Sequence, residues 1–163
     1  MNNLFITYYE SPVGILLISG TDTSIKSLEF LDSPKDETEK SNAYLEKCKR
    51  QLDEYFQNKR EQFELNLDPD GNKFQLKVWD ELLKIPYGKT ISYFEQSRRV
   101  GDVKSIRAVA KANSQNKIGI IIPCHRVIGA DGSLVGFGGS LWRKKWLLEH
   151  ESKITGEQLS LDI

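Results

Sequence analysis

The chain has 163 residues, a formal net charge of zero and 39% hydrophobic residues, which is the composition of an ordinary globular protein and excludes collagen-like and disordered chains. It contains no run of about 18 apolar residues and does not start like a signal peptide, so we expect a cytoplasmic protein with no membrane segment. Its two cysteines, Cys48 and Cys124, and its two histidines lack the spacing of a zinc site. We therefore expect two thiols, no metal and no cofactor.

Charge is distributed unevenly along the chain. Residues 1–69 hold 8 basic and 13 acidic side chains, whereas residues 70–163 hold 15 and 10. Between residues 89 and 126, 8 basic side chains occur with only 2 acidic ones. Such a segment is either a solvated helical surface, which is the commoner case, or a surface that meets a polyanion.

The N-terminal half predicts three strands followed by a helix. Short β-rich runs at residues 4–9, 14–20 and 25–31 are separated by turn signals, which predicts a small antiparallel sheet. Apolar residues then recur at helical spacing between residues 37 and 58, which predicts an amphipathic helix packed on that sheet. Cys48 lies on the apolar stripe of this helix, where a free cysteine acts as a small core residue.

A domain boundary is indicated at Asp-Pro-Asp-Gly, residues 68–71, because this is turn chemistry and the charge balance changes sign there. We expect one domain over residues 1–69, a second over residues 70–155, and a flexible tail over residues 156–163.

The second domain begins with predicted helices. The first covers residues 73–85, and two shorter ones cover residues 92–100 and 104–112, with Ser92 as an N-cap and a turn at residues 101–102. This outline fits a DNA-binding helix-turn-helix, although many helical hairpins share it.

An apolar run at residues 118–122 then predicts a buried strand. A glycine-rich loop, residues 129–140, follows it, and residues 141–151 predict an amphipathic helix. The glycines of the loop serve either ordinary turns or the close approach of a ligand.

Cys124 follows the apolar run and Pro123, and it stands beside His125. A thiol attacks as its thiolate, and the ordinary cysteine pKa of about 8.5 leaves little thiolate at neutral pH. His125 could remove the proton directly or through a water, and a carboxylate from Glu149 or Glu151 could orient the imidazole. Adjacent side chains on extended backbone point apart, so the Cys-His pair alone is not specific.

The wider string is more specific. IPCHRV, residues 122–127, resembles the active-site motif of the O6-alkylguanine-DNA alkyltransferases, also called methylated-DNA–protein-cysteine methyltransferases. ISY, RAV, GFGG and WLLEHE match the neighbouring motifs in order and spacing, over most of residues 74–151. The resemblance implies an α+β fold, in which a small N-terminal antiparallel sheet plus helix, a ribonuclease H-like lobe, precedes a mainly helical C-terminal lobe with a winged helix-turn-helix-like DNA-binding motif.

The resemblance also implies a function, which is DNA repair by direct reversal. The alkyl group on guanine O6 is transferred once to Cys124, and intact guanine remains in the DNA. His125 is then expected to be the water-mediated base, Glu151 the group that orients it, and Asn116 the brace of the turn below the site. The expected partner of this monomer is double-stranded DNA carrying O6-alkylguanine, bound through the minor groove with the damaged base rotated out.

Further residues are implied at the DNA. Arg107 matches the arginine that fills the vacated place in the base stack, and Tyr93 matches the tyrosine that crowds a phosphate and promotes rotation. Lys111 stands where glycine is usual and is expected to reach a phosphate instead. The other residues expected at the DNA or the substrate are Ser105, Ala108, Ala110, Arg126, Phe137, Gly138, Gly139, Ser140 and Lys144.

Two features carry separate expectations. Phe137 stands where the family commonly has tyrosine, so we expect slower transfer, with backbone N–H groups of residues 138–140 or Lys144 compensating. The tail QLSLDI, residues 158–163, resembles peptides that dock on the DNA sliding clamp, and an unstructured end is the alternative.

Two other functions compete with the transferase. A lesion-binding protein would keep the DNA-binding parts and lack the cysteine, and Cys124 argues against it. A hydrolytic cysteine enzyme acting on a small molecule would use the same Cys-His-Glu set. Turnover separates the three, because one alkyl group, none or many would be captured per protein.

Overall fold

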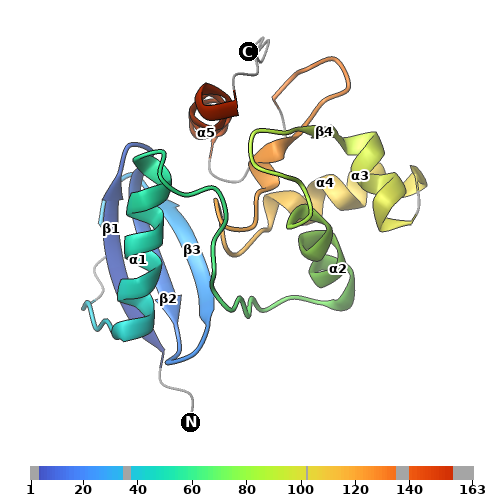
Figure 1. Cartoon of the computed structure of the whole chain (residues 1–163). Coiled ribbons are helices and arrows are strands. Elements are labelled where there is room, and N and C mark those ends of the chain that lie inside the picture. The colour runs from blue at the N-terminus through green and yellow to red at the C-terminus, as the bar shows by residue number, and fades with distance from the viewer. Residues whose placement is uncertain (1–3, 35–37, 102, 135–139, 156–163) are drawn as a thin grey trace. The chain divides into compact units, whose positions relative to one another are not determined.

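The computed structural model describes residues 4–34, 38–101, 103–134 and 140–155. The chain divides into two compact units (Figure 1). Unit 1 comprises Met1–Asp70 and Lys117–Gly119, and unit 2 comprises Gly71–Asn116 and Ile120–Ile163. No helix within the described residues is long and apolar enough to cross a membrane.

Unit 1 is built on an antiparallel sheet with the order β1-β2-β3. The strands are β1 (Phe5–Ser11), β2 (Gly14–Gly20) and β3 (Ile25–Leu31), which confirms the three predicted strands. Gly14 closes the turn between β1 and β2 at a φ of 106°, a backbone conformation that glycine adopts without steric cost.

Helix α1 (Ala43–Phe56) packs across one face of this sheet (Figure 1). It begins later than predicted because Asn42 caps it, with the Asn42 side chain accepting a hydrogen bond from the Leu45 N–H at 2.8 Å. Cys48 is fully buried on the inner face, and burial raises the pKa of its thiol to about 12. Both cysteines are free thiols, as predicted.

The apolar run at residues 118–122 is not one strand. Ile118 pairs in parallel with Leu28 of β3, and the Gly119 N–H donates to the Leu28 carbonyl at 3.2 Å. At Ile120 the backbone turns to a φ of 69°, and the chain leaves the sheet. The predicted strand is therefore wrong after residue 119, because a short apolar run does not show where strand pairing stops.

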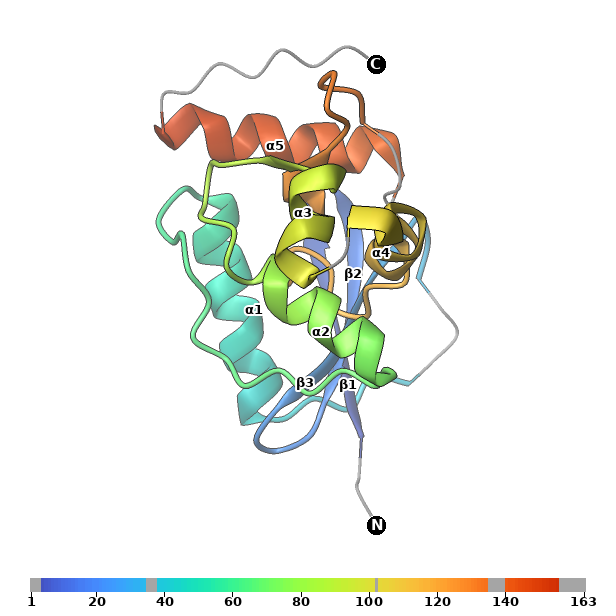
Figure 2. The same ribbon diagram turned by 90° about the vertical axis from the view of Figure 1, so that its right-hand side faces the viewer.

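Unit 2 is mainly helical, and its helices α2, α3 and α4 contact one another (Figure 2). Its two short strands, β4 and β5, pair in parallel. The elements of unit 2 are α2 (Lys73–Leu82), β4 (Ile91–Ser92), α3 (Tyr93–Val100), the 3-10 turn Val103–Ser105, α4 (Ile106–Ser114), the 3-10 turn Cys124–Arg126, β5 (Val127–Ile128) and α5 (Leu141–Thr155). With unit 1 they give the predicted α+β fold, which is confirmed.

Caps set the ends of the helix-turn-helix. Ser92 begins α3 as predicted, with its hydroxyl accepting from the Glu95 N–H at 3.0 Å. Gly101 ends α3 in the left-handed conformation, at a φ of 118°. The next helix, α4, begins at Ile106 rather than at residue 104, because the preceding three residues form a 3-10 turn.

Directional hydrogen bonds orient α4 within unit 2. The Trp79 indole N–H of α2 donates to the Ala112 carbonyl at 2.9 Å. Gln96 of α3 and Asn113 of α4 face each other with reciprocal amide hydrogen bonds of 2.7 Å, and each is 1% exposed. The buried apolar residues of α4 are Val109 and Ala112, so its apolar contact is small. The hydrogen bonds to Trp79 and Gln96 therefore help to fix the orientation of α4.

Candidate active site

Cys124 opens a 3-10 turn directly after Pro123 and is 6% exposed. Asn116, which follows the end of α4, donates from Nδ2 to Cys124 Sγ at 3.2 Å and to the Ile122 carbonyl at 2.8 Å. The Asn116 side chain therefore fixes both the turn and the sulfur. Burial raises the pKa of Cys124, while the Asn116 hydrogen bond and the Lys144 charge act to lower it.

His125, the second residue of this turn, forms a buried pair with Glu151. His125 Nε2 and Glu151 Oε2 are 2.7 Å apart, and the two side chains are 0% and 1% exposed. Glu151 comes from α5, so the turn and the last helix meet at this contact. The structure thus selects Glu151 over Glu149, which is exposed.

The protonation states of the pair follow from its surroundings. Burial alone would raise the pKa of Glu151, but His125 and Arg126 outweigh it and hold this pKa well below its ordinary value. Burial lowers the pKa of His125, which keeps the ring neutral at neutral pH. A neutral ring beside a carboxylate carries its proton on Nε2, so Nδ1 is left with a lone pair. Nδ1 is buried and has no hydrogen-bond partner among the described residues, and it can accept a proton.

Arg126 lies inside the protein rather than at a DNA surface. It is 7% exposed, and its Nε and Nη2 donate to the two Glu151 oxygens at 2.8 and 3.1 Å. Its Nη1 donates to the Ile85 carbonyl at 2.7 Å. These three bonds correct the expected DNA contact, since the guanidinium fork holds Glu151 instead. Sequence reasoning missed this role, because the anionic partner of Arg126 lies 25 residues away in the chain.

Lys144 and Tyr93 form a second buried contact of the site. Lys144 is fully buried, and its Nζ donates to the Tyr93 hydroxyl at 3.4 Å. Burial lowers the pKa of Lys144 to about 8, while the charge of Cys124 acts to raise it. Burial, helped by the charge of Cys124, raises the pKa of Tyr93 to about 12. Both side chains are thus electrostatically coupled to the sulfur.

Five of the residues expected at the DNA lie on or next to α4. Arg107, Ala108 and Lys111 are exposed, while Ser105 and Ala110 are half-buried. Apart from Arg107 and Lys111 these side chains are small, and small side chains allow the helix to approach the floor of a DNA groove closely.

The glycine-rich loop is described only at its ends. Phe137, Gly138 and Gly139 lie outside the described residues. Ser140 is described, with a φ of 105° and a buried hydroxyl that has no partner among the described residues. Within the same residues, no group of three or more His, Cys, Asp or Glu side chains could hold a metal ion.

Two family profiles match the chain. Residues 73–153 match the DNA binding domain of 6-O-methylguanine DNA methyltransferase, and residues 4–69 match the ribonuclease-like domain named for the same protein. The Methanosarcina barkeri protein named methylated-DNA–protein-cysteine methyltransferase is 42% identical over 154 residues, which cover 91% of this chain and 97% of that protein. A Mycobacterium leprae protein of the same name is 43% identical over 146 residues, which cover 87% and 88%.

Solved structures agree with these matches. The crystal structure of Mycobacterium tuberculosis O6-methylguanine methyltransferase has a TM-score of 0.85 and 37% identity, and the match covers 93% of this chain and 94% of that one. The structure of Mycobacterium tuberculosis OGT in complex with DNA has a TM-score of 0.83 and 39% identity, with 90% and 91% covered. Motif, fold and relatives agree along nearly the whole length, and the chain belongs to the 6-O-methylguanine DNA methyltransferase family.

Proposed function

We propose that this protein repairs DNA by direct reversal and moves the alkyl group from guanine O6 to Cys124 Sγ. The observation that carries the proposal is the buried set at this sulfur, where Asn116 donates to Sγ at 3.2 Å and the adjacent His125 contacts Glu151 at 2.7 Å. Family membership supports the same reaction, because the relatives are named methylated-DNA–protein-cysteine methyltransferases.

The proposed reaction conserves every proton. The Cys124 thiol passes its proton to His125 Nδ1, directly or through a water, while Glu151 stabilises the imidazolium that forms. The thiolate attacks the alkyl carbon, the bond from that carbon to O6 breaks, and its electron pair stays on the guanine. The guanine anion then takes up a proton from the imidazolium, directly or through solvent, and His125 returns to its neutral form. The product thioether has no good leaving group, so each protein molecule reacts once.

The reacting base must leave the duplex to reach a buried sulfur. Rotating a nucleotide out costs a few kcal/mol, which contacts in the vacated stack can offset. Arg107 is exposed on α4 and is proposed to fill that place, while the small residues beside it let α4 enter the minor groove. Tyr93 is proposed to crowd the phosphate of the rotating nucleotide, and Lys144 lies against its hydroxyl.

The direct test uses a duplex with one O6-methylguanine and the intact mass of the protein. We expect the gain of one methyl group, located at Cys124 by peptide analysis, and no gain in Cys124→Ala. Excess damaged duplex should leave the stoichiometry at one per protein. Repeated turnover would favour the hydrolytic enzyme, and binding without transfer would favour the lesion-binding protein.

Phe137 is proposed to limit the rate, because it lacks the hydroxyl that tyrosine would place near the departing O6. We expect Phe137→Tyr to raise the single-turnover rate constant several-fold, as one added hydrogen bond to a developing charge would do. Quenched-flow measurement on the methylated duplex checks this, and an unchanged or lower rate constant would refute it.

We further propose that the protein is a cytoplasmic monomer whose residues 158–163 dock on the DNA sliding clamp. The tail lies outside the described residues, so the support is its sequence alone. Deleting residues 157–163 should abolish binding to purified clamp while methyl transfer is unchanged. If the deletion leaves clamp binding unaltered, or if the full chain does not bind the clamp, this docking role is excluded. Equilibrium sedimentation tests whether the protein is a monomer.

A further inference from the structure

We propose that Arg98 and Arg99, at the end of α3, bind a DNA backbone phosphate, and that Glu95 occupies this site in the free protein. The inference rests on the proposed function, since it takes DNA as the partner. Glu95 Oε1 accepts from Arg98 Nε at 2.9 Å, and Glu95 Oε2 accepts from Arg98 Nη2 at 2.6 Å and from Arg99 Nε at 2.8 Å. One carboxylate thus sits between two guanidinium groups.

The site is open to a larger anion. The Arg98 side chain is 62% exposed, Arg99 is 36% exposed and Glu95 is 28% exposed. Each guanidinium has five N–H groups, and apart from those bonded to Glu95 they have no hydrogen-bond partner among the described residues. The fork geometry that holds the carboxylate also fits two phosphate oxygens.

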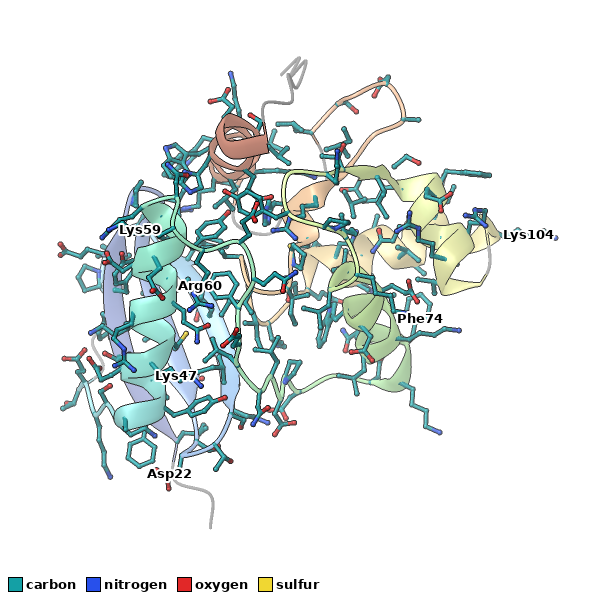
Figure 3. All side chains as sticks on the ribbon, viewed as in Figure 1. Asp22, Lys47, Lys59, Arg60, Phe74 and Lys104 are labelled. Atoms are coloured by element: carbon teal, nitrogen blue, oxygen red, sulfur yellow. The ribbon has the colours of Figure 1, made fainter. Side chains whose placement is uncertain are left out.

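The position of the pair favours a phosphate of the same DNA. Arg98 and Arg99 lie in the last turn of α3, and Lys104 lies in the segment that joins α3 to α4 (Figure 3). Arg107 is exposed one helical turn later. In helix-turn-helix proteins the first helix crosses the DNA backbone while the second enters a groove, so this end of α3 is suited to a backbone contact.

The sequence has two acidic residues between 93 and 111, Glu95 and Asp102, and Glu95 is the one that contacts Arg98 and Arg99. Hydrogen bonds from Arg98 and Arg99 lower the pKa of Glu95 to about 2, so it remains charged at neutral pH and protonation does not release the arginines. An exposed ion pair contributes little net stability, and a phosphate can displace the carboxylate at small cost. In the free protein, Glu95 therefore weakens the attraction of this surface for DNA. When a phosphate replaces the carboxylate, Arg98 and Arg99 bind the phosphate instead.

The variant Glu95→Gln tests this, because glutamine keeps the side-chain length and suits the third helical position as well as glutamate. We expect undamaged duplex to bind about 3- to 10-fold more tightly at low salt, and the slope of log K against log salt to steepen by about 0.9, the value for one charge, because no carboxylate then competes with the phosphate for the two arginines. Adding Arg98→Gln and Arg99→Gln should remove the gain.

The matched control is Glu81→Gln on α2. Glu81 also pairs with a cation three residues away, Lys84 at 2.8 Å, so the change in net charge is the same and an ion pair is again lost, although Glu95 holds two cations and Glu81 holds one. Equal effects of the two variants, or a gain that survives loss of both arginines, would overturn the phosphate site. Methyl transfer to Cys124 is measured on the same preparations. Its absence in the parent protein would instead refute the proposed function.

Discussion

At the scale of single residues, Arg126 is buried and holds Glu151. Its substitution should therefore affect alkyl transfer and leave DNA binding unchanged. Its three hydrogen bonds need a guanidinium fork, and a lysine in its place could make only part of them. We expect Arg126→Lys to slow alkyl transfer by about 10-fold or more, because Glu151 and His125 lose their fixed geometry. Affinity for undamaged duplex should not change. Single-turnover kinetics and fluorescence anisotropy measure the two quantities.

A loss of DNA affinity in Arg126→Lys, with the transfer rate preserved, would restore the DNA contact expected from sequence. That expectation shows what local sequence leaves open. The string IPCHRV and its family resemblance indicated Cys124 and His125, and the same resemblance supplied Glu151, which lies 26 residues after His125 in sequence. The residues near Arg126 in sequence do not indicate whether its side chain is buried, because this depends on where Glu151 lies after folding.

Ser140 is a second residue whose backbone matters. Its φ of 105° is easy for glycine and costs an L-residue roughly 1 to 3 kcal/mol. Glycine also has more freedom in the unfolded chain, which offsets part of the gain. We expect Ser140→Gly to stabilise unit 2 by about 1 kcal/mol in urea unfolding, whereas Ser140→Ala keeps the strained Cβ and should not stabilise. Equal effects of both changes would show that the hydroxyl, not the backbone, is responsible.

At the scale of elements, the Gln96–Asn113 pair joins the two helices of the helix-turn-helix. Replacing one partner leaves a buried amide without hydrogen bonds, whereas replacing both with apolar side chains of similar shape is close to neutral. We expect Gln96→Leu and Asn113→Leu each to lower the free energy of unfolding by about 1 to 3 kcal/mol. The double variant should lose much less than the sum. A double-mutant cycle in urea measures the coupling, and additive losses would contradict it.

Predictability at this scale depends on how local the signals are. The three strands, the Ser92 cap and the turn at Gly101 follow from neighbouring residues, and sequence located them well. The run at residues 118–122 failed because its first part pairs with β3, about 90 residues earlier in the chain. The left-handed conformation of Ile120 then turns the chain, and nothing in a β-branched residue signals it.

At the scale of the whole molecule, the buried pair of the active site links folding to pH. Burial lowers the pKa of His125 from its ordinary 6.5, and interactions with His125 and Arg126 overcome burial to lower the pKa of Glu151 from 4.5. As the pH falls through about 6.5, the unfolded chain protonates His125 while the folded protein keeps it neutral, so folding is weakened. Below about 4.5 the unfolded chain also protonates Glu151, and folding is weakened further.

We therefore expect the free energy of unfolding of unit 2 to decline in two steps on acidification, each approaching about 1.4 kcal/mol per pH unit. Tryptophan fluorescence isolates this unit, because all three tryptophans, Trp79, Trp142 and Trp146, belong to it. His125→Gln keeps an N–H donor for Glu151 and removes the titration. In this variant the decline between pH 6.5 and 4.5 should shrink while the decline below 4.5 persists. If the upper step kept its full size in the variant, another group would have to be its source, and His125 would not be held neutral by its burial.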